Sequence, residues 1–179
     1  LDDQLHSFDF IITCIGDDED LRQIYSSDNG LINRCKAGTI FIDHTTASAD
    51  IARKIATEAS NKHMSFIDAP VSGGEQGAIN GQLTIMCGGN EKAFNQANPV
   101  MQHYAKAVTL LGENGAGQLT KMSNQLAVAG VVQGLAEAIH FAEHANRSLF
   151  SKHFIWHVKS MFRYLSITYK FIKPYQNNK

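Results

Sequence analysis

Short apolar runs and longer amphipathic segments alternate along the first two thirds of the chain. The runs are rich in β-branched residues and predict strands at 8–15, 39–43, 64–68, 83–89 and 107–111. The segments between them have apolar residues at three- and four-residue steps and predict helices at 17–28, 48–61 and 91–104. Strands that alternate with helices favour βαβ units, so the pattern predicts an α/β fold with a mostly parallel sheet.

Residues 115–146 have a pattern of another kind, in which the helical spacing continues without interruption. The recurring apolar positions, predicted to form a buried face, are Leu119, Met122, Leu126, Ala129, Val132, Leu135 and Ile139. A helix of this length would measure about 45 Å at 1.5 Å per residue. It is expected to lead into a second domain or a partner subunit, with Gly130 and Gly134 allowing close approach of another backbone.

Charge divides the chain after residue 146. All 17 acidic residues precede this point, whereas 7 of the 16 Lys and Arg residues and 8 of the 16 aromatic residues lie in 147–179. A basic aromatic segment could bind an anionic membrane or nucleic acid. An out-of-frame or truncated reading would also explain so abrupt a change, and we favour it.

Composition narrows the class of protein. With 179 residues, 44% apolar and 18% charged, the chain is expected to form a soluble globular domain with a real core. Three scattered cysteines suit neither a disulfide framework nor a metal site, and the eight histidines show no metal-binding spacing. No signal peptide or membrane-spanning run is recognised, so the expected location is the cytoplasm.

The candidate chemistry is concentrated at predicted strand ends. Residues 68–89 contain six of the 14 glycines, and Ser72 directly precedes Gly73 and Gly74. A hydroxyl beside free backbone N–H groups can hold a carboxylate, although a glycine-rich turn with a solvent-facing serine has the same sequence. Lys121 near the start of the long helix could exchange a proton with a substrate oxygen, or could be an ordinary surface lysine.

Four sequence motifs together resemble the β-hydroxyacid dehydrogenases. They are DHTT at 43–46, DAPVSGG at 68–74, GQLTIMCGG at 81–89 and GAGQLTK at 115–121. This family includes 3-hydroxyisobutyrate dehydrogenase and 2-hydroxy-3-oxopropionate reductase, with 6-phosphogluconate dehydrogenase as a more distant relative. The resemblance covers roughly residues 8–146. It implies an oxidoreductase that uses NAD or NADP, with a Rossmann domain joined by a long helix to a helical domain.

The resemblance also implies roles for individual residues. Ser72, Gly73 and Gly74 would bind the carboxylate of a small-molecule hydroxy acid, and Lys121 would be the general acid/base. Thr46 would contact the nicotinamide end of the cofactor, with Ile15 and Gly16 along its adenine–ribose side. The family's asparagine four residues after the lysine is replaced here by Gln125, which we favour over Asn124 for orienting the substrate. Family members are expected to be homo-oligomers.

Departures from the family pattern define the expected domains. No GxGxxG fingerprint occurs, so the first βαβ unit is expected to be missing and 1–114 to be a partial NAD(P)-binding Rossmann domain. Residues 115–146 would form the interdomain helix, and 147–179 a tail that does not match the family. We therefore expect a fragment with little or no activity alone. The alternative is a non-catalytic module whose tail binds membrane or nucleic acid.

Overall fold

A computed structural model describes residues 2–145, which fall into two compact units with a boundary after Leu126. The strands are β1 (Phe10–Thr13), β2 (Ile40–Asp43), β3 (Ser65–Asp68), β4 (Val71–Ser72), β5 (Leu83–Gly88) and β6 (Ala105–Gly112). A 3-10 helix at Asp2–Ser7 precedes α1 (Asp18–Ser26), α2 (Leu31–Arg34), α3 (Ala49–Ser60), α4 (Gly74–Ile79), α5 (Glu91–Met101) and α6 (Ala116–Ala145).

All six strands belong to one sheet in the first unit. The order is β1-β2-β3-β5-β4, and β6 also pairs with β5. The pairings β1–β2, β2–β3 and β5–β6 are parallel, whereas β5 runs antiparallel to β3 and β4. The expected α/β, Rossmann-type and mostly parallel sheet followed by a long helix is confirmed.

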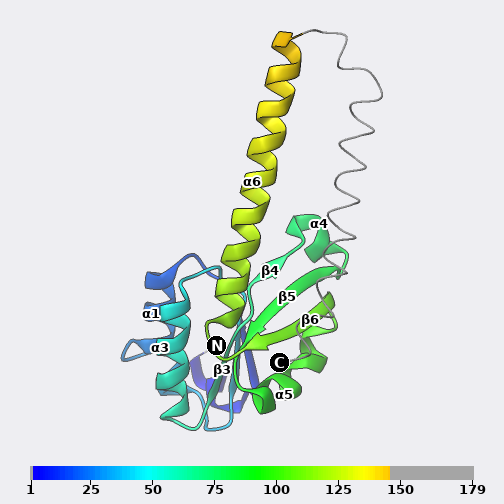
Figure 1. Ribbon diagram of the computed structural model, residues 1–179. Coiled ribbons are helices and arrows are strands. Elements are labelled where there is room, and N and C mark those ends of the chain that lie inside the picture. The colour runs from blue at the N-terminus through cyan, green and yellow to red at the C-terminus, as the bar shows by residue number, and fades with distance from the viewer. Residues whose placement is uncertain (1, 146–179) are drawn as a thin grey trace, which may run out of the picture. The chain divides into compact units, whose positions relative to one another are not determined.

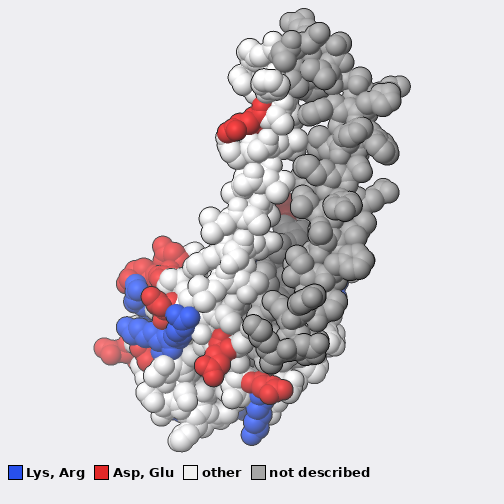
Figure 2. All heavy atoms as spheres, in the orientation of Figure 1, with Lys and Arg blue, Asp and Glu red and all other residues white. Residues whose placement is uncertain are grey.

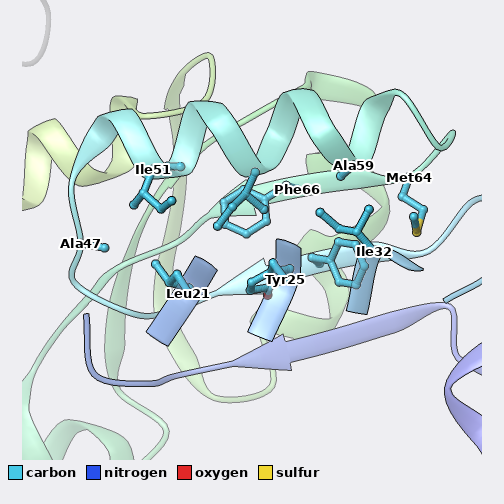
Figure 3. Close-up of a cluster of buried hydrophobic side chains, with 11 residues drawn as sticks. Leu21, Tyr25, Ile32, Ala47, Ile51, Ala59, Met64 and Phe66 are labelled. Carbon is cyan, nitrogen blue, oxygen red and sulfur yellow. The ribbon is translucent and has the colours of Figure 1, made fainter. Parts of the chain in front are cut away.

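The helices α1 and α3 cover one face of the sheet, and α5 covers the other (Figure 1). On the first face, Tyr25 is fully buried, and its ring is edge-on to those of Phe41 and Phe66 at centroid distances of 5.2 and 5.4 Å. Figure 3 shows Tyr25 and Phe66 in this cluster. On the second face, Ile42 and Ile67 are packed in one cluster with residues of α5. Two buried faces explain why the strands read as continuous apolar runs.

Helix starts follow from capping side chains. Asp17, Ser48 and Asn90 each accept hydrogen bonds from backbone N–H groups in the first turn of α1, α3 and α5. Such caps satisfy donors that have no partner inside the helix, which is why these starts are readable from sequence. Pro99 lies inside α5 near its end, so it does not break the helix before Met101.

The first turns of α6 correct one expectation. Leu119, Met122 and Leu126, predicted to be buried, are 48%, 38% and 76% exposed. The buried side chains are instead the polar Gln118 and Lys121, because this face lies on carbonyl and carboxylate groups of the sheet. In the first turns of α6, the apolar positions therefore do not lie on the face that packs against the sheet.

Several expectations about the chain's organisation are not decided by the fold. A Cβ added at Gly130 or Gly134 would meet no described atom within 4 Å, so the close backbone approach expected there is not seen among residues 2–145. The domain limits 1–114, 115–146 and 147–179 remain predictions, and the tail at 147–179 lies outside the described residues.

The surface over α1 and α3 is charged with both signs. Ion pairs within these helices join Arg22 to Glu19 and Arg53 to Asp50, and Figure 2 shows blue and red side chains side by side in this region. Exposed pairs of this kind contribute little to stability. In the part of the chain that is described, every helix is too short or too polar to cross a membrane.

Candidate functional site

The glycine-rich segment forms a turn from β4 into the short helix α4. Ser72 ends β4 opposite Thr84 of β5. Gly73 and Gly74 follow with φ angles of +138° and +61°, which side chains with a Cβ rarely adopt. The need for glycine here is thus one of backbone conformation, and both residues are exposed to solvent.

The start of α6 is held against the sheet by Asp68 at the end of β3. Its two carboxylate oxygens accept hydrogen bonds from Gly115 N at 2.8 Å and Gln118 N at 3.1 Å. A Cβ on Gly117 would lie 2.4 Å from Met86 O, so glycine permits this close approach. Burial raises the pKa of Asp68 to about 6, and the two N–H donors oppose that rise.

Lys121 lies one turn farther along α6 and is only 9% exposed. Its Nζ donates a hydrogen bond of 2.9 Å to Val71 O, directly before Ser72. Lys121 and Ser72 both line a cavity of about 640 Å³. The cavity is lined by Ile12, Cys14, His44, Val71, Ser72, Gly73, Gly74, Glu75, Ala78, Leu83, Tyr104, Lys121 and Gln125.

The cavity therefore brings together five of the eight residues that the sequence singles out. Ser72, Gly73, Gly74, Lys121 and Gln125 line it, although they come from segments about 50 positions apart in the chain. Gln125 lines it from the turn of α6 after Lys121, and Asn124 does not. A second cavity of about 460 Å³, lined in part by Arg53 and Asn90, contains none of the predicted site residues.

Ile15, Gly16 and Thr46 do not line the main cavity. Gly16 and Thr46 are exposed and Ile15 is half-buried, at the edge where β1 and β2 end. The two strand ends are tied together because Ile15 N donates to the hydroxyl of Thr45 at 3.0 Å. These three residues thus gather at one edge of the sheet, as parallel neighbouring strands require.

A buried carboxyl group organises that edge. Asp43 Oδ1 accepts hydrogen bonds of 2.7 Å from the hydroxyls of Thr13 and Thr45. The other oxygen, Oδ2, has no partner within the described part of the chain. Burial raises the pKa of Asp43, and the hydroxyl donors oppose the rise. The carboxyl therefore fixes Thr45, whose hydroxyl in turn holds Ile15 N.

His44 and Tyr104 line the cavity but are not among the predicted site residues. His44 Nδ1 is 2.6 Å from Ala69 O, a pure acceptor, so this nitrogen carries the hydrogen. His44 Nε2 then accepts from the Tyr104 hydroxyl at 2.9 Å. Burial lowers the pKa of His44 and raises that of Tyr104 to about 12, so both are neutral at pH 7.

A sequence signal existed for only one member of this pair. His44 directly follows β2 and is part of the DHTT motif at 43–46. Tyr104 follows α5, and its approach to the cavity depends on the antiparallel placement of β5 beside β3. Within residues 2–145, no group of three or more His, Cys, Asp or Glu side chains is arranged to hold a metal ion.

Comparison with known proteins identifies the family. Residues 1–112 match the NAD binding domain of 6-phosphogluconate dehydrogenase. The chain belongs to this family. Its relatives include an uncharacterized oxidoreductase of Shewanella frigidimarina, which is 53% identical over 137 residues; the match covers 76% of this chain and 47% of the relative. The 2-hydroxy-3-oxopropionate reductase of Escherichia coli is 34% identical, and the match covers 76% of this chain and 47% of the reductase.

A solved structure of the same family has the same fold. The 3-hydroxyisobutyrate dehydrogenase of Mycobacterium tuberculosis, determined with L-serine, is 33% identical and superposes with a TM-score of 0.75. The match covers 79% of this chain and 47% of that one. The expected resemblance to the β-hydroxyacid dehydrogenase family is therefore confirmed. The chain spans about half the length of the curated relatives it matches.

Proposed function

We propose that this chain carries the substrate-binding and proton-transferring residues of an oxidoreductase that uses NAD or NADP and acts on a short 3-hydroxy acid. The observation that carries the proposal is the cavity shared by Ser72, Gly73, Gly74 and Lys121. It combines a hydroxyl, an open glycine turn and a buried amine within one space, which suits a small anion with a hydroxyl group.

Each residue has a defined task in this reaction. The Ser72 hydroxyl and the backbone at Gly73 and Gly74 bind the substrate carboxylate. During oxidation, Lys121 in its neutral amine form takes the proton from the substrate hydroxyl and becomes an ammonium. During reduction the ammonium returns that proton, while Gln125 orients the substrate from the next turn of α6. A bound nicotinamide cofactor supplies or accepts the hydride. Holding the carboxylate and the hydroxyl at once fixes the reacting carbon, and such positioning is a large part of catalysis.

The residues proposed to contact the cofactor lie together at one strand edge. Thr46 and Gly16 are exposed at the strand edge, and the Asp43–Thr45–Ile15 hydrogen bonds keep that edge in one conformation. Thr46 would lie against the nicotinamide, with Ile15 and Gly16 farther along the cofactor. The name of the matched domain and the cofactors of the relatives support NAD or NADP as the class. A cytoplasmic location and homo-oligomeric assembly remain predictions.

Binding of a small hydroxy acid tests the proposal without requiring turnover. The chain is titrated with 3-hydroxyisobutyrate and with L-serine, and binding is followed by NMR signals of Gly73 and Gly74. Lys121→Ala removes the cation and should weaken binding at least about tenfold, as expected for loss of a charged hydrogen bond. Lys92→Ala, which removes an exposed lysine of α5, should leave the affinity unchanged.

Absence of any binding would contradict the proposal, and so would either of two results in which binding is seen. One is tight binding of the acid that Lys121→Ala leaves unaffected. The other is binding that shifts signals elsewhere in the chain and leaves those of Gly73 and Gly74 unmoved. Turnover with NAD and with NADP is measured on the same samples, and we expect little from this chain alone.

A further inference from the structure

Gln118 is a buried polar side chain at a position that the apolar pattern of α6 does not predict to be buried. It is 1% exposed, and both ends of its amide are used. Nε2 donates to Thr45 O at 2.7 Å, and Oε1 accepts from Ala47 N at 3.0 Å. A buried amide with a donor and an acceptor both satisfied is strongly oriented, because any rotation would leave buried groups without partners.

The two backbone groups held by Gln118 flank Thr46. Thr45 is tied independently to the sheet, since its hydroxyl and N–H donate to Asp43 Oδ1 at 2.7 and 3.3 Å. Within residues 2–145, Thr46 itself makes no hydrogen bond, and it is exposed. Its position is therefore set by the residues on either side, and Gln118 is the side chain that fixes both.

Gln118 and Lys121 belong to the same helix, α6, which fixes their relative positions. The two residues are one helical turn apart on the buried face, and the backbone N–H of Gln118 is anchored by Asp68. A rigid turn of helix thus connects the 45–47 segment to the amine at the cavity. On the proposed function, one end of this connection meets the cofactor and the other meets the substrate hydroxyl.

We infer that Gln118 is a positioning residue that holds Thr46 in register with Lys121, so that the cofactor-facing edge and the proton-transferring amine keep one relative geometry. This inference rests on the proposed function for its catalytic consequence. Its structural part, the control of the 45–47 segment by one amide, stands on the hydrogen bonds alone.

Two substitutions separate this role from general packing. Gln118→Met has a similar volume and makes neither hydrogen bond. Gln118→Glu keeps the acceptor for Ala47 N but loses the donor to Thr45 O when ionised, and regains a donor when protonated. Titratable groups around this site include Asp68, which accepts from Gln118 N, Asp43, which accepts from Thr45, and Asp18, which accepts from Ser48 N, with Lys121 one helical turn away. Because the wild-type chain has them too, each variant is compared with wild type at the same pH.

Amide hydrogen exchange and NMR shifts provide the main measurement. In Gln118→Met, exchange at Ala47 should be about fivefold to tenfold faster at every pH, as for loss of one or two hydrogen bonds. In Gln118→Glu, the shifts of Thr46 and Ala47 should differ from wild type at pH 8 and return towards it at low pH. The signals of Gly73 and Gly74 should stay in place. Gln133→Met, an exposed glutamine of the same helix bonded to Glu137, is the matched control and should change none of these.

A folded Gln118→Met with wild-type exchange at Ala47 would overturn the inference. If that variant does not fold, Gln118→Glu decides, and shifts at Thr46 and Ala47 that do not respond to pH would overturn it. Where turnover is measurable, Gln118→Met should lower kcat about tenfold to a hundredfold and leave the KM for the hydroxy acid unchanged. A wild-type chain that fails to bind any hydroxy acid would reject the proposed function, whereas the exchange result would still decide the role of Gln118.

Discussion

At the scale of single residues, burial decides what the polar groups do. Asp68 has no exposed surface, yet its carboxylate accepts two backbone N–H groups at the start of α6. Removing a charge from water favours its neutral form, and this effect exceeds that of the two donors because the pKa rises from 3.8 to about 6. Asp68 is therefore both an anchor for α6 and a source of pH dependence.

Asp68→Asn tests this link between anchor and titration. A raised carboxyl pKa means that the folded chain binds the proton more tightly than the unfolded chain. The contribution of Asp68 to the free energy of unfolding is therefore complete below about pH 4 and is lost as pH rises through about 6, by up to about 3 kcal/mol. Urea unfolding is measured from pH 4 to 8 for both proteins.

The informative quantity is the difference between wild type and Asp68→Asn, because other carboxyl groups titrate in both. The free energy of unfolding of wild type minus that of Asp68→Asn should be largest at low pH, where the wild-type carboxyl is protonated. It should decrease as the pH rises. A difference that is constant from pH 4 to 8 would show that Asp68 does not titrate in this range.

The sequence predicts some of these residues and not others. Ser72, Gly73, Gly74 and Lys121 are identifiable because their types and spacing form motifs. Gln118 lies inside the GAGQLTK motif, but an amide in a helix has many uses and the motif does not reveal its role, and Tyr104 lies outside all four motifs. Their importance follows from partners about 70 and 60 positions away in the chain, which only the folded arrangement brings near.

At the scale of elements, α6 is fitted to the sheet by the absence of a side chain at Gly117. A Cβ there would lie 2.4 Å from Met86 O and 2.6 Å from Asp68 O. Both are backbone atoms, so neither can rotate away. The contact between helix and sheet thus depends on glycine at this position, whereas a Cβ at Gly134 of the same helix would have no described atom within 4 Å.

Alanine at these two glycines should have opposite effects. Gly117→Ala should lower the free energy of unfolding by about 1–3 kcal/mol or more, because α6 must move off β3 and β5. Gly134→Ala should leave stability unchanged or raise it by up to about 1 kcal/mol through better helix propensity. Denaturant unfolding measures both. A loss at Gly134 equal to that at Gly117 would contradict the close-contact explanation.

Element prediction succeeded where local rules suffice. α3 begins at the residue after Ser48 and ends before Asn61, because a side-chain cap and apolar residues at helical spacing agree. α2, β4 and α4 were not predicted, since runs of four, two and six residues are too short to show a period. The expected burial of Leu119, Met122 and Leu126 was wrong, because the first turns of α6 bury hydrogen-bonding groups instead.

At the scale of the whole molecule, the chain corresponds to about half of its curated relatives. Its 179 residues contain no GxGxxG, the turn that places pyrophosphate on a helix N-terminus. NADH fluorescence is therefore expected to show no saturation at micromolar concentrations of the cofactor. Micromolar binding would mean that the strand edge at Ile15, Gly16 and Thr46 holds the dinucleotide without that turn.

Lys121 has no carboxylate partner among the ion pairs of the described residues, and its ammonium group is held only by the carbonyl of Val71. A positive charge that lines a cavity and has no ion-pair partner attracts small anions, even with Glu75 elsewhere in the same lining. Chloride or phosphate from the buffer should then compete with the hydroxy acid. The apparent affinity for substrate should consequently fall as salt is added, more than screening of exposed charges alone would cause.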